Sequence, residues 1–113
     1  MDAKGLPIVH RFVTDHNSDV KAVFNKAFDE PLGWQVIGNK AEFAFAYATN
    51  KYPVDLNDDK DINTYKKYQQ DLLGLTIPGG TVLRYVDMPP GSTSPMHRTV
   101  SLDYGVVLEG TVE

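Results

Sequence analysis

Four polar side chains recur at every second position between residues 97 and 103. They are His97, Thr99, Ser101 and Asp103. Side chains of a β-strand alternate between its two faces, so these four groups would share one face of a strand. A neutral imidazole nitrogen and a carboxylate oxygen both bind divalent metal ions. The alternation alone leaves two interpretations open, which are a binding site and a surface that faces solvent.

These residues belong to a longer spacing pattern that starts at Gly91 and ends at Gly110. Written with its fixed residues and the number of residues between them, the pattern is G-x5-H-x-T-x3-D-x6-G. It resembles the first motif of the cupin superfamily, G-x5-H-x-H-x3–4-E-x6-G, in which a β-hairpin carries metal ligands. The resemblance implies His97 and Asp103 as ligands of a divalent transition metal such as Zn, Mn, Fe or Co. Thr99 stands where the family has a second histidine, and a neutral hydroxyl is a poor ligand for such an ion.

The resemblance covers most of the chain and is strongest over residues 80–113. There the sequence looks like the small single-domain cupins that are common in fungi, some of which sit among polyketide biosynthesis enzymes. It implies a metal-dependent decarboxylase or dehydratase that acts on a small or aromatic polyketide-type carbonyl acid. In such an enzyme, Thr99 and Ser101 would orient water or substrate, and Arg84 would orient an anionic group. We therefore expect these three residues to be catalytic.

The second cupin motif, which supplies a further histidine to the same metal, has no counterpart in the sequence. We expect one cupin-like domain over residues 1–113, with the first motif at 91–110. Its fold would be an all-β double-stranded β-helix, or jelly roll, that is incomplete at the C-terminus or closed by dimerisation, because open strand edges pair with other chains. A shortened form of a longer cupin, and a smaller sandwich closed by the N-terminal strands, stay open as alternatives.

A second function fits the same residues. Thr99 and the missing second motif also suit a non-catalytic cupin remnant that binds a small molecule or forms a homodimer. In that case His97 would hydrogen-bond to Asp103 or to water, and Asp103 would pair with Arg84 or Arg98. Such a protein would hold no transition metal but would keep a pocket for an apolar ligand.

The composition argues against several other classes of protein. The chain has 113 residues, a formal net charge of −4 and no cysteine, which removes disulfides, thiolate catalysis and cysteine-bound zinc. No basic patch stands out, so neither nucleic acid nor an anionic membrane surface is expected as a partner. No apolar run approaches the roughly 18 residues of a membrane span, and no secretory signal is visible. We expect a cytoplasmic protein that binds a small-molecule substrate or ligand and forms a homodimer.

Short strands joined by turns are expected to position the site. From Glu42 to Thr49, three aromatic residues alternate with three alanines, which is typical of a strand whose small face lies under another layer. A short helix is expected near 62–73, ended by Gly74. Residues 20–28 are interpreted as either strand or helix, and a hairpin turn is expected at Glu109 and Gly110. Further strands are predicted at 8–14, 34–37, 81–88, 100–102 and 104–108.

Overall fold

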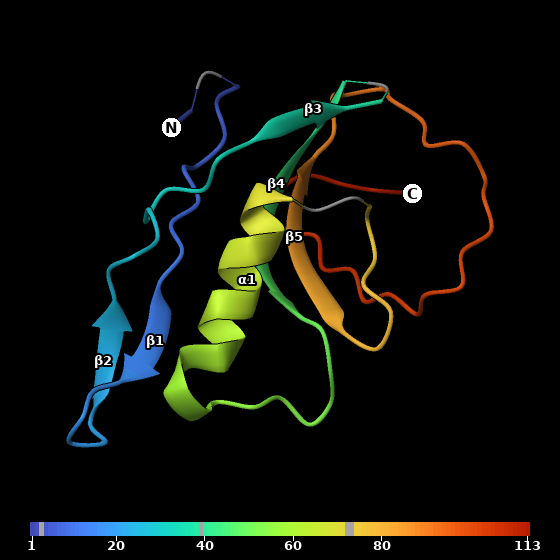
Figure 1. Ribbon diagram of the computed structural model, residues 1–113. Helices are drawn as coiled ribbons and strands as arrows, with labels where there is room; N and C mark the ends of the chain where they lie inside the picture. The colour runs from blue at the N-terminus through green and yellow to red at the C-terminus, as the bar shows by residue number, and fades with distance from the viewer. Residues whose placement is uncertain (3, 39, 72–73) are drawn as a thin grey trace.

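Antiparallel strands and one short helix make up the regular part of the protein. The computed structural model describes residues 1–2, 4–38, 40–71 and 74–113. The elements are β1 (Val13–His16), β2 (Ala22–Asn25), β3 (Gln35–Ile37), β4 (Ala41–Thr49), the 3₁₀ turn η1 (Asn57–Asp59), α1 (Lys60–Gln70) and β5 (Thr81–Asp87). β1 pairs with β2, and β4 lies between β3 and β5 in a second sheet (Figure 1). This arrangement agrees with the predicted all-β class, while the jelly roll itself stays a prediction.

β4 is the central strand, and its alternating sequence explains its place. The alanines at 44, 46 and 48 are almost completely buried, whereas the aromatic residues between them are partly exposed. Because the alanine face is small, Leu32 packs closely against Ala44 and Ala46. β5 pairs with β4 along its whole length, with a bulge between Phe45 and Tyr47. The predicted strand and its small, buried face are both confirmed.

Tyr65 fixes α1 against β4. Its ring is fully buried and lies 4.8 to 5.1 Å, centroid to centroid, from the rings of Phe28, Phe45 and Tyr47. The Tyr65 hydroxyl donates a hydrogen bond to the Phe45 carbonyl oxygen at 2.9 Å and accepts one from Arg11. Arg11 also donates to the Ala46 carbonyl oxygen at 3.1 Å. β3 pairs only with residues 41–43 of β4. Arg11 and Tyr65 therefore supply hydrogen-bond donors to carbonyl groups of β4 that lie past the end of β3, at Phe45 and Ala46.

Tyr65→Phe is expected to lower the free energy of unfolding by about 1–3 kcal/mol, because it leaves buried partners of the hydroxyl unsatisfied while it keeps the ring. Denaturant unfolding followed by circular dichroism measures the loss. Tyr68→Phe is the matched control on the same helix, since the Tyr68 hydroxyl makes no hydrogen bond to the described residues. Equal losses in the two variants would contradict the role given to the Tyr65 hydroxyl.

The N-terminal elements differ from their predicted bounds. Of the strand predicted at 8–14, only Val13 and Thr14 lie in β1. The residues before Val13 lie beside residues 30–32, and a single isolated β-bridge between His10 and Pro31 joins the two segments. Proline has no N–H group to continue a ladder, which explains why no regular strand forms there. The predictions at 34–37 and 81–88 are confirmed by β3 and β5, and 20–28 contains the strand β2.

The predicted helix is confirmed with different bounds. It begins at Lys60 and ends at Gln70, because Asp71 leaves the helical conformation with φ −149° and ψ 56°. Gly74 therefore does not end it, and the predicted helical residues Leu72 and Leu73 lie outside the described residues. No helix in the described part of the chain has the length and apolar character needed to cross a bilayer.

The two strands predicted in the motif are wrong for this structure. Residues 88–113 contain no helix or strand and run as a wide, open arc beside the sheet (Figure 1). A strand needs a neighbour for its N–H and C=O groups, yet residues 93–113 make no backbone–backbone hydrogen bond with the described residues. The predicted hairpin turn at 109–110 is accordingly only a bend, with Gly110 at φ 87°. The sequence of this segment alternates as in a strand, but no described strand lies beside it to accept and donate the backbone hydrogen bonds.

Candidate functional site

The predicted site residues lie on the irregular arc that follows β5. His97, Thr99 and Asp103 are exposed, and Ser101 is half-buried. The residues between them are exposed as well, so burial does not alternate along this segment. The single polar face that the spacing predicts is therefore not formed in the isolated chain.

The His97 ring has one nitrogen held by the backbone. Its Nδ1 lies 2.8 Å from the carbonyl oxygen of Pro95. A carbonyl oxygen only accepts hydrogen bonds, so Nδ1 carries the proton and Nε2 keeps the lone pair of the neutral ring. Metal-binding histidines commonly have their second nitrogen held in this way. Nε2 is thus the His97 atom available to a metal, whereas the Thr99 hydroxyl donates to the Ser101 carbonyl oxygen at 3.1 Å.

The described residues do not assemble a metal site by themselves. No group of three or more His, Asp or Glu side chains is placed to hold an ion in the part of the chain that the structure describes. Catalytic zinc sites, for comparison, use three protein ligands and one open position. His97 and Asp103 supply two donor side chains at most, and Thr99 replaces a third. In the conformation seen here, His97 and Asp103 therefore do not complete a site for a divalent transition metal.

Arg84 is the predicted site residue that lies in the sheet, and not on the arc. It lies in β5, half-buried, and its Nη2 donates to the Leu75 carbonyl oxygen at 2.8 Å. Its guanidinium carbon lies 5.5 Å from the centroid of the Phe43 ring. Burial lowers the pKa of Arg84, and the negative charge of Asp103 acts in the opposite direction. The guanidinium stays protonated at neutral pH, and the described residues contain no ion pair between Arg84 and Asp103.

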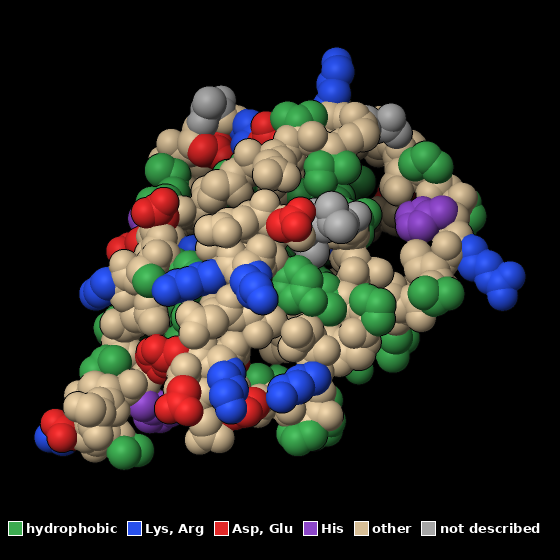
Figure 2. Space-filling view, viewed as in Figure 1, with side chains coloured by type: hydrophobic (Ala, Val, Ile, Leu, Met, Phe, Trp, Pro, Cys, Tyr) green, Lys and Arg blue, Asp and Glu red, His purple; other side chains and the backbone are tan. Residues whose placement is uncertain are grey.

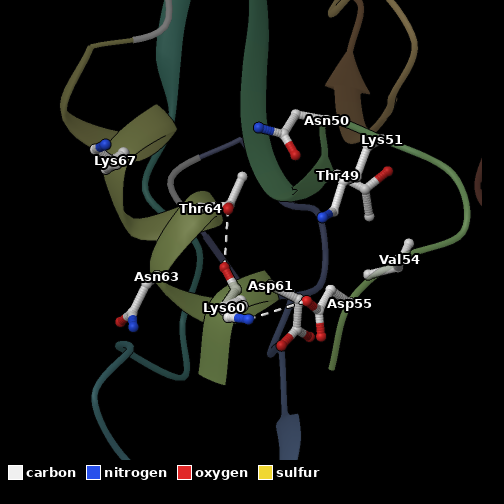
Figure 3. Close-up of a pocket in the computed structure, with 10 residues that line it drawn as sticks. All are labelled: Thr49, Asn50, Lys51, Val54, Asp55, Lys60, Asp61, Asn63, Thr64 and Lys67. Atoms are coloured by element: carbon white, nitrogen blue, oxygen red, sulfur yellow. Dashed lines mark hydrogen bonds and ion pairs between the residues drawn. The ribbon is translucent and has the colours of Figure 1, made fainter. Parts of the chain in front are cut away.

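A pocket of about 390 Å³ lies elsewhere, between the end of β4 and α1 (Figure 3). Its lining residues are Thr49, Asn50, Lys51, Val54, Asp55, Lys60, Asp61, Asn63, Thr64 and Lys67. Lys60 forms an ion pair with Asp55 at 3.2 Å, and the pKa of Asp55 is lowered by the Asn57 backbone N–H and by Lys60. No predicted site residue lines this pocket. Residues 60, 63, 64 and 67 have the spacing of one helix face, so the sequence indicates that they could form one wall of a pocket. No sequence signal places the end of β4 opposite that face.

Curated relatives match nearly the whole chain. Phomopsin biosynthesis cluster protein C' of Diaporthe leptostromiformis is 48% identical over 92% of this chain and 55% of the relative. Oryzines biosynthesis cluster protein J of Aspergillus oryzae is 41% identical over 97% of this chain and 62% of the relative. Cupin-domain-containing oxidoreductase virC of Hypocrea virens is 40% identical over 96% of this chain and 54% of the relative. This relative and others described as cupin-domain-containing oxidoreductases support a cupin-like family for this chain.

The chain spans about half the length of the curated relatives it matches. No protein-family model matches the chain. Thr99 and Asp103 are also its two departures from the cupin motif that it resembles.

Proposed function

We propose that this chain acts within a cupin-like, metal-dependent enzyme of secondary-metabolite biosynthesis. The proposal is carried by the spacing from Gly91 to Gly110 in a chain whose relatives include cupin-domain-containing oxidoreductases and biosynthesis cluster proteins. His97 would contribute Nε2 and Asp103 a carboxylate oxygen to the metal. Residues 97–103 would have to adopt the paired strand that their alternation predicts before the two donors share one face.

The proposed reaction is decarboxylation or dehydration of a small or aromatic polyketide-type carbonyl acid. Arg84 carries the permanent positive charge that a substrate carboxylate requires. Its contacts with the Leu75 carbonyl oxygen and the Phe43 ring fix the direction of the guanidinium. The hydroxyls of Thr99 and Ser101 would orient water or the substrate beside the proposed ligands.

Oxidation or reduction is the second candidate reaction, because four relatives at 30 to 40% identity are described as oxidoreductases. Product analysis separates the two candidates. A decarboxylase releases carbon dioxide and a dehydratase releases water without change in oxidation state, whereas an oxidoreductase consumes an oxidant or a reductant with its substrate.

A non-catalytic cupin remnant is the alternative from another class of function. It is favoured by the lack of a group of three donors among the described residues and by the threonine at position 99. The remnant would bind a small apolar ligand without a metal. It predicts that ligand binding survives treatment with a chelator.

The metal content of the purified protein tests the enzyme proposal. We expect elemental mass spectrometry to find close to one transition-metal ion per assembled site, and His97→Ala to lose it by a factor of ten or more, because a coordinating imidazole is removed. His16→Ala, which removes an exposed histidine of β1, is the matched control and should keep the metal. Absence of metal from the unmodified protein would contradict the enzyme proposal and support the remnant.

A further inference from the structure

The chain exposes far more surface than a folded monomer of its size. Its accessible surface is 9314 Å², whereas a compact protein of 12.6 kDa is expected to expose roughly 6,200 Å². Its radius of gyration is 15.9 Å, against about 13 Å for a compact chain of this length. An excess of this size indicates that part of the surface is covered by other polypeptide in the assembled protein.

Apolar side chains of the C-terminal arc account for much of this exposure. Val100, Leu102 and Tyr104 expose 103%, 88% and 95% of their surface, and Val106 exposes 82%. Hydrophobic side chains lie along this arc in the face shown in Figure 2. Every even position from 100 to 108 carries an exposed apolar residue, whereas the odd positions 99, 101 and 103 are polar and, of the odd positions from 99 to 109, only 107 carries an exposed large apolar residue, Val107. We call residues 96–112 the motif segment.

The backbone of the motif segment also pairs with no described strand. Its residues make no backbone–backbone hydrogen bond with the described chain. A segment whose sequence would give it one apolar face when extended, and whose backbone pairs with no strand, is a template for pairing with another strand. Covering it satisfies the backbone groups and removes the apolar face from water at the same time.

We propose that a second copy of this chain covers the motif segment, by antiparallel pairing about a two-fold axis at Tyr104. In this register Tyr104 lies opposite Tyr104 of the second copy, because the axis passes between them. The remaining apolar pairs are Leu102 with Val106, Val100 with Leu108 and Met96 with Val112. One sequence thus supplies both matching faces, as an isologous interface requires.

Other registers are less favourable. Placing the axis at Asp103 sets this carboxylate opposite its own copy, and like charges directly opposite each other destabilise a strand pair. Placing the axis between residues 103 and 104 sets the apolar row of one copy beside the polar row of the other. With the axis at Tyr104, Asp103 faces Gly105 instead. The surface available also suffices, since a standard interface needs only about 800 Å² from each partner.

Disulfide trapping tests the proposed register, because the chain has no cysteine of its own. Directly opposite residues of an antiparallel pair have Cβ atoms about 5 Å apart, which is close to the range that a disulfide spans. We expect Tyr104→Cys to form a disulfide-linked dimer as its major product under mild oxidation. Mixed Leu102→Cys and Val106→Cys chains should link to each other at least severalfold more than either links to itself.

Asp19→Cys, in the turn between β1 and β2, is the exposed control and should link only at the background rate. Circular dichroism of each variant before oxidation shows that the fold is kept. The proposal is overturned if Tyr104→Cys links no faster than the control. It is also overturned if the chain is monomeric by light scattering, in which case polypeptide of another origin covers the segment. Neither result depends on whether the protein binds a metal.

Discussion

Leu102→Asp is expected to weaken self-association of the chain at least about 100-fold. In the proposed pairing Leu102 lies opposite Val106, so each copy would bury a carboxylate against an apolar side chain with no partner for its charge. Burial of an unpaired charge costs several kcal/mol, and each 1.4 kcal/mol is a factor of ten in the dissociation constant. Analytical ultracentrifugation over a range of concentrations measures the change.

Ser94→Asp is the matched control for this variant. It adds the same charge to an exposed residue of the same arc, outside the motif segment. We expect its dissociation constant to stay within about twofold of the unmodified chain, because an exposed charge is solvated. If Leu102→Asp dimerises as tightly as Ser94→Asp, residue 102 does not lie in the interface.

Gly80→Ala is expected to destabilise the fold by about 3 kcal/mol or more, which corresponds to a fall in Tm of roughly 10–20 °C. A Cβ atom at position 80 would lie 1.9 Å from the Thr49 carbonyl oxygen and 2.7 Å from the Asn50 Cα. Both are backbone atoms and cannot rotate away. The ends of β4 and β5 would have to separate, and the Thr49–Thr81 hydroxyl contact at 2.7 Å would be lost with them.

Gly33→Ala is the control for Gly80→Ala, since a Cβ atom at position 33 meets no atom within 4 Å. Its backbone also lies outside the left-handed region, so alanine causes no strain there. Thermal unfolding followed by circular dichroism should therefore show a much smaller change in Tm. Similar Tm values for the two variants would mean that the ends of β4 and β5 are not in close contact.

Local sequence patterns predicted the centre of the fold because their interactions are local. The alternation of aromatic residues and alanines sets the two faces of β4 wherever that strand is placed. Helical spacing around Tyr65 likewise predicted α1. The hydrogen bonds between Arg11 and Tyr65 were not predictable, because residues 54 positions apart in the sequence are brought together only by the tertiary fold.

The candidate site shows the opposite case. The spacing of His97 and Asp103 identifies a cupin-like motif, but a strand forms only when another strand accepts its hydrogen bonds. No described strand pairs with residues 97–103, so the same pattern that predicts a strand yields an exposed arc. The pairing of Asp103 with Arg84 or Arg98 that the sequence left open is not seen among the described residues. Arg84 instead contacts the Leu75 carbonyl oxygen in the loop before β5 and the Phe43 ring of β4, and both contacts depend on the tertiary fold.

Hydrogen–deuterium exchange of the amides of residues 97–109 tests the central claim most directly, which is that the motif segment is a strand awaiting its partner. We predict that these amides are protected when the chain is concentrated enough to dimerise and exchange at the rate of an unfolded peptide when it is diluted to monomer. The amides of β4 should stay protected at both concentrations. Rapid exchange of residues 97–109 at every concentration, with β4 still protected, would contradict the account.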